Sequence, residues 1–147
     1  MRIDEYSKPK IVRSLKKVIE LWGGPFRVES GKPWREAVAE WRRKGGIIVH
    51  LTVYGELLTH ELVERIKREN KPIMVIVGSQ KVPREFFSEE VSDYNVSIGS
   101  QPHSEVSSLA IFLDRILEAE WLRREFRNAK LKVIPQPRGK KVVRVKP

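Results

Sequence analysis

The residues best suited to chemistry lie in one polar run, residues 98–105, which precedes the apolar helical pattern VSSLAIFLDRIL. This run holds glycine, proline, hydroxyl, amide, imidazole and carboxylate groups within eight positions. A second polar segment, residues 78–82, follows the apolar stretch at 73–77. Ligands of open α/β folds bind beyond the carboxyl ends of the strands. We therefore expect the two polar segments to line one pocket.

Two familiar catalytic arrangements are not supported by these residues. His103, Ser104 and Glu105 have the residue types of a hydrolase triad, but three consecutive residues cannot converge on one point, and no G-x-S-x-G motif is present. The three histidines lack the close spacing of metal ligands, and the chain has no cysteine. The sequence also lacks the glycine motifs that bind nucleoside triphosphates or dinucleotides. We expect no metal.

Composition indicates one soluble globular domain with an anionic partner. The chain has 147 residues, 40% of them apolar and 33% charged, and contains neither a secretory signal nor an apolar run of membrane-spanning length. We therefore expect a cytoplasmic protein. The net charge of +10 favours a phosphate-rich partner. The basic tail that ends in KKVVRVKP is equally consistent with phosphate contact and with a solvated surface.

The elements that must position the polar segments follow from apolar periodicity. Helical spacing alternates with short apolar runs, which predicts an α/β fold with a parallel sheet flanked by helices. The last helix would be about 35 Å long, and two short β-like pieces follow it at 131–134 and 142–145. We expect helices at 11–22, 34–41, 58–66 and 106–126, and strands at 26–29, 47–51, 73–77 and 94–98.

Four segments occur in a characteristic order: WGGPF, VHLTVYG, VGSQKVPREFF, and IGSQPHSEVSSLAIFLDRIL with its follower AKLKVIPQPRGKKVV. Together they resemble the archaeal tRNA 2'-O-methyltransferase family that modifies cytidine 56, a branch of the SPOUT (α/β-knot) superfamily. The resemblance covers roughly residues 11–143. Its most specific part is the Gln-Pro-His-Ser-Glu block before a long helix.

The resemblance implies a single SPOUT methyltransferase domain over residues 1–147, with a deep trefoil knot in its C-terminal part and a basic extension at 131–147. It implies a homodimer that methylates the ribose 2'-hydroxyl of cytidine 56 in tRNA, with S-adenosyl-L-methionine as methyl donor and no metal. By motif position, the expected cofactor contacts are Leu51, Gly78, Ser79, Gln80, Lys81, Val82, Ile98, Gly99, Ser100, Gln101, Pro102, His103, Ser104 and Glu105.

Two departures from the family bear on activity. The family opens with a strand and a basic loop, RLGHRP…RD…TTH, that brings the arginine thought to assist the 2'-hydroxyl, and this chain has no counterpart of it. Since residues 1–4 look like the end of a strand, we expect an N-terminally incomplete domain. In addition, Gln80 stands where the family usually has glutamate. These departures predict a preserved cofactor site with impaired activity of the isolated chain.

Two other classes of function stay open. One is a non-catalytic, knotted RNA-binding or dimerisation module that lost its chemistry together with the N-terminal motif. The other is a small-molecule α/β binding domain that does not contact RNA. No catalytic residue is assigned, although Ser104 and Asn95 lie near the expected site.

Overall fold

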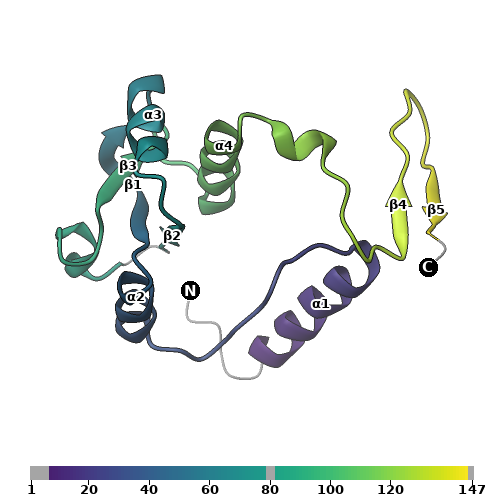
Figure 1. Ribbon diagram of the computed structural model, residues 1–147, viewed down its shortest axis with the longest axis horizontal. Helices are drawn as coiled ribbons and strands as arrows, with labels where there is room; N and C mark the ends of the chain where they lie inside the picture. Colours follow the sequence, from purple (N-terminus) through teal and green to yellow (C-terminus); the bar gives the residue numbers. More distant parts are fainter. Residues whose placement is uncertain (1–6, 79–81, 146–147) are drawn as a thin grey trace. The chain divides into compact units, whose positions relative to one another are not determined.

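The computed structural model describes residues 7–78 and 82–145, and the chain divides into two compact units (Figure 1). Pro33–Leu122 make up one, called here the sheet unit. Arg2–Lys32 and Arg123–Pro147 make up the other, called the hairpin unit. Each unit is described by itself.

The sheet unit is built on three parallel strands. They are β1 (Ile47–Leu57), β2 (Ile73–Val77) and β3 (Tyr94–Ser97), in the order β2-β1-β3. The first five residues of the central strand, IIVHL, are buried, as expected for a strand covered on both faces. The predicted parallel sheet flanked by helices is confirmed, and so are the strands predicted at 47–51, 73–77 and 94–98.

Helices cover both faces of this sheet. On one face, α3 (His60–Arg68) and α4 (Glu105–Leu117) bury Leu62, Ile66 and Phe112 against Val49 and Leu51. On the other face lie α2 (Trp34–Arg43) and the 3-10 turn η1 (Arg84–Phe87), which pack around Ile48. Successive residues of β1 therefore point into opposite layers of core, which is the period of two expected for a strand.

The hairpin unit joins the two ends of the sequence. Its elements are α1 (Ser7–Trp22) and an antiparallel pair, β4 (Leu131–Val133) and β5 (Val142–Arg144). The amide of Gly24 donates to the Arg127 carbonyl at 3.2 Å, and the amide of Lys130 donates to the Leu21 carbonyl at 2.9 Å. The two predicted β-like pieces are confirmed as a hairpin, and its first strand is anchored to the end of α1.

Three sequence expectations are wrong, one in the existence of a strand and two in where an element ends. Residues 26–29 form no strand, because an isolated extended segment needs a neighbouring strand and no described strand pairs with it. The long helix ends at Leu117, about 20 Å from its start, because Glu118 and Ala119 take left-handed φ values of 50° and 57°. The strand expected to end at Leu51 continues to Leu57 after an interruption.

Candidate functional site

The strand register brings the predicted cofactor segments to one edge of the sheet. Leu51 of β1 pairs with Val77 of β2 on one side and with Val96 of β3 on the other. Gly78 therefore follows directly after one partner of Leu51, and Ile98 lies two residues beyond the other partner. Because the three strands are parallel, these positions lie together at the carboxyl edge, where α/β sheets bind ligands.

The segment after β3 is a tight turn held by its own hydrogen bonds. The Ser97 hydroxyl donates to the Gly99 carbonyl at 2.7 Å, and Nδ1 of His103 lies 2.8 Å from the Gln101 carbonyl oxygen. Ile98 and Gly99 are half-buried, whereas residues 100–105 are exposed. The turn thus presents backbone groups and small polar side chains at the surface.

This turn leads directly into α4. Ser104 is the N-cap, since its Oγ accepts a hydrogen bond from the Ser107 amide at 3.1 Å. Glu105 is the first residue of the helix, where a carboxylate is favoured by the helix dipole. Ser104 therefore has a structural role, and the amides at the start of α4 lie at the same edge as Leu51.

Two glycines at this edge meet different surroundings. A Cβ atom at Gly78 would lie 2.0 Å from Cγ1 of Val82, so the chain closes tightly on itself there. A Cβ atom at Gly99 would meet no described atom within 4 Å. Gly99 is half-buried, and the open space beside it lets a ligand approach its backbone closely. The predicted residues Ser79, Gln80 and Lys81 lie outside the described residues.

Behind the carboxyl edge, a hydrogen bond between a buried histidine and a half-buried asparagine links two strands. His50 is 1% exposed, and its Nδ1 lies 2.9 Å from Oδ1 of Asn95. The amide nitrogen of Asn95 donates to the Phe87 carbonyl at 3.3 Å. Burial lowers the pKa of His50, while hydrogen bonds with Asn95 and with the Phe86 backbone act in the opposite direction. Asn95 is thus engaged in a structural network.

The sequence reasoning missed an excursion in β1 directly after Leu51. Leu51 and Glu56 both align with Val96, so residues 52–55 leave the ladder with β3. A Cβ atom at Gly55 would lie 2.4 Å from the Asn95 carbonyl carbon, which only glycine permits. The glycine inside the apolar run VHLTVYG was the available signal, because glycine within a strand marks a bulge or a close backbone approach.

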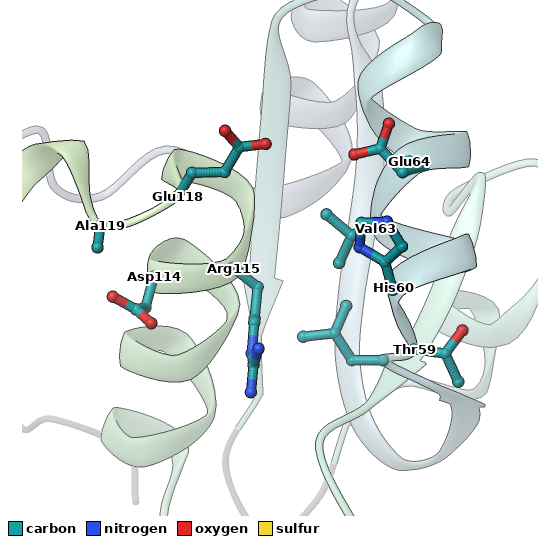
Figure 2. Close-up of a pocket in the computed structure, with 9 residues that line it drawn as sticks. Thr59, His60, Val63, Glu64, Asp114, Arg115, Glu118 and Ala119 are labelled. Atoms are coloured by element: carbon teal, nitrogen blue, oxygen red, sulfur yellow. The ribbon is translucent and has the colours of Figure 1, made fainter.

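A separate pocket of about 530 Å³ lies between α3 and α4 (Figure 2). The carboxylates of Glu64 and Glu118 lie at one end of it, and Arg115 extends along it between the helices. Lys67 forms ion pairs with both carboxylates. None of the described residues predicted to contact the cofactor lines this pocket.

Two kinds of feature are absent from the described residues. In residues 7–78 and 82–145, no three His, Asp or Glu side chains are grouped so that they could hold a metal ion. Within the same ranges, every helix is too short or too polar to cross a membrane.

Comparison with known proteins gives consistent relatives. The family described as "tRNA ribose 2'-O-methyltransferase, aTrm56" matches residues 22–143. A protein of Thermofilum pendens is 51% identical over 142 residues, which is 97% of this chain and 77% of that protein. Proteins of Thermococcus kodakarensis and Pyrococcus abyssi are 48% and 53% identical, over 97% and 92% of this chain and over 76% and 67% of their own lengths. All three are named tRNA (cytidine(56)-2'-O)-methyltransferase.

Proposed function

Because this chain belongs to the tRNA ribose 2'-O-methyltransferase family, we propose that it methylates the ribose 2'-hydroxyl of cytidine 56 in tRNA, with S-adenosylmethionine as the donor. The observation that carries the proposal is the meeting of Leu51, Gly78 and the 98–105 turn at one sheet edge, within a chain that matches the family over residues 22–143. The names of the relatives do not favour a non-catalytic module.

The donor supplies a methyl group on a positively charged sulfur, and the protein supplies alignment. In the proposed site, Leu51 and residues 78–82 and 98–105 hold the donor, mostly through backbone amides and carbonyls. The open space beside Gly99 belongs to the donor. Holding donor and 2'-hydroxyl in attack geometry can supply about 7–11 kcal/mol of the barrier reduction. This chemistry needs no metal.

Charge divides between the two units in a way that supports tRNA as the substrate. Residues 2–32 and 123–147 carry 18 Lys and Arg against five Asp and Glu, whereas residues 33–122 carry 11 against 14. The whole basic excess therefore belongs to the hairpin unit, and residues 33–122 carry a small net negative charge. We propose that this unit holds RNA phosphates. Within the β4–β5 hairpin, the cations without an ion pair to a described carboxylate include Arg138, Lys140, Lys141 and Arg144.

The proposal also includes a homodimer. Val106, Ala110, Leu113 and Leu117 are exposed and are spaced by four, three and four residues, so they share one face of α4. The opposite face of this helix carries Phe112, which is buried. One apolar face of α4 packs on the sheet, and the other is exposed. An exposed apolar face of this kind is typical of a protein interface, and we propose that another copy of this chain covers it.

Three features of the proposal rest on the family. The C-terminal part of the sheet would be threaded as a deep trefoil knot, the arrangement that names the α/β-knot superfamily. The domain would be a single SPOUT methyltransferase domain with residues 131–147 as a basic extension. The protein would work in the cytoplasm, where its proposed substrate is processed.

The cofactor site is tested by calorimetry with S-adenosylmethionine on wild type and on Gly99→Ala. The new methyl group meets no described atom, so we expect an unchanged melting temperature together with a tenfold or greater loss of donor affinity. Equal affinity of the two proteins, or no binding by wild type at millimolar donor, would refute the cofactor site.

The reaction is tested by transfer of labelled methyl groups to tRNA transcripts. In keeping with the predicted impairment, we expect slow incorporation that disappears when cytidine 56 is replaced. Protein that binds tRNA without incorporation would favour the non-catalytic module. In the same assay, Gln80→Glu restores the residue usual in the family. A higher rate for this variant would support impairment by the neutral side chain.

A further inference from the structure

Tyr54 is the most exposed large apolar side chain in the part of the chain that the structure describes, with 84% of its surface accessible. It lies in the excursion at 52–55, three residues after the proposed cofactor contact Leu51. An aromatic ring left in water contributes little to folding, because its apolar area is not buried. The exposed Tyr54 ring is therefore available to bind a partner.

The backbone that carries Tyr54 is fixed on both sides. β1 pairs with β3 before the excursion, at Leu51, and again after it, at Glu56. Gly55 packs directly on the backbone between Asn95 and Val96. The ring is therefore presented from a rigid frame, which lowers the entropy cost of binding a ligand with it.

A second ring lies beside Tyr54. The ring centroids of Tyr54 and Phe87 are 6.5 Å apart, and Phe87 packs edge-on against buried His50 at 5.0 Å. Phe87 is 39% exposed, and its backbone carbonyl is held by Asn95. The three rings form a row that runs from the core at His50 to the solvent at Tyr54.

We infer that Tyr54, supported by Phe87, stacks on the base of the nucleotide that receives the methyl group. This inference rests on the proposed function. A ribose that reaches a donor near Leu51 must bring its base to the same sheet edge, and that base leaves the RNA stack in doing so. Exposed aromatic rings replace such lost stacking for any base, so Tyr54 strengthens binding without selecting cytosine.

The test pairs changes in the ring with changes in the base. Dissociation constants are measured for wild type, Tyr54→Phe and Tyr54→Leu on two tRNAs, one intact and one abasic at position 56. On intact tRNA we expect Tyr54→Leu to bind about 10- to 100-fold more weakly and Tyr54→Phe to bind within about threefold of wild type. On abasic tRNA all three proteins should bind alike.

Two controls keep the outcomes distinct. Trp121→Leu changes another exposed aromatic residue, 47% accessible and in the sheet unit, and should leave both constants unchanged. Methyl transfer by wild type to intact tRNA tests the proposed function separately from the stacking role. A fluorescent cytosine analogue at position 56 should be quenched by wild type, a readout that needs no variant.

Two results would overturn the inference. If Tyr54→Leu weakens intact and abasic tRNA equally, the ring contacts something other than that base. If the variant instead changes the oligomeric state, Tyr54 belongs to a protein interface together with its exposed neighbours Val53 and Leu57.

Discussion

The segment that joins β4 to β5 carries three cations whose removal should change tRNA binding in a calculable way. Arg138, Lys140 and Lys141 are exposed, and none forms an ion pair with a described carboxylate. The triple variant R138Q/K140Q/K141Q removes three positive charges from a turn between strands, where no helix or core depends on them. We expect the fold and the donor affinity to be unchanged.

The magnitude follows from counterion release. Each phosphate contact contributes about 0.7–0.9 to the slope of log affinity against log salt, so three lost contacts should lower that slope by about 2–3. At about 0.1 M salt the same relation predicts a loss of tRNA affinity of about 100- to 500-fold, and the affinities of the two proteins should converge near 1 M. In methyl transfer, KM for tRNA should rise while kcat at saturating tRNA stays near the wild-type value.

A matched variant separates local contact from total charge. R43Q/K44Q/R68Q removes three exposed cations from the sheet unit, none of them paired with a described carboxylate. This variant should keep a slope within about one unit of wild type. Equal loss of slope in both triple variants would show that net charge alone attracts the RNA, and the assignment of phosphate binding to the hairpin unit would then be wrong.

Three further predictions concern the folded structure itself. Gly23→Ala should accelerate hydrogen exchange at the Lys130 amide, because the new Cβ would lie 2.5 Å from the Arg127 carbonyl oxygen. Gly45→Ala has the same φ of 73° but lies in open space, so it should cost only about 1–2 kcal/mol of backbone strain. Equal effects of the two substitutions on exchange at Lys130 would contradict a docking role for Gly23. Because burial lowers the pKa of His50, the unfolded chain takes up the proton before the folded protein does as pH falls below about 6.5. The free energy of unfolding, measured in urea, should therefore drop by up to about 1.4 kcal/mol per pH unit between pH 6.5 and 5. A His50→Gln variant whose stability has the same pH dependence would refute this cause. Leu113→Glu should convert the proposed dimer to monomer in sedimentation, because an unpaired carboxylate is costly to bury in an interface. The control Val143→Glu, at an exposed site on the hairpin, should leave the dimer intact. A dimer that survives Leu113→Glu would place the interface elsewhere.

Much of the sheet unit was predictable because its signals are local. A continuous apolar run such as IIVHL can be satisfied only by burial on both faces, and turn residues follow each predicted strand. The meeting of Leu51, Gly78 and the 98–105 turn at one edge follows from the parallel order of the strands. The starts of α3 and α4 lie within two residues of the predicted positions, and the structure shows that Thr59 and Ser104 are their N-cap residues.

Other boundaries depend on partners distant in sequence. The α4 helix ends early where Glu118 takes a left-handed conformation and pairs with Lys67 of α3, although no glycine or proline marks that position. Residues 26–29 have a strand-like composition but no described strand beside them. The four-residue excursion in β1 exists because two positions of one strand align with Val96 of another.

By itself, the sequence determined the alternation of strands and helices, the glycine and hydroxyl chemistry of the turns, and the family. Those properties depend on residue patterns within short segments, and these patterns can be recognised without knowing the contacts to distant segments. Only the tertiary structure decided that Tyr54 projects into solvent beside Phe87, and that residues 2–32 and 123–147 combine into one strongly basic unit. Strand register and the docking of the chain ends are fixed by contacts between segments far apart in the chain. The local periodicity of apolar residues does not predict such long-range contacts.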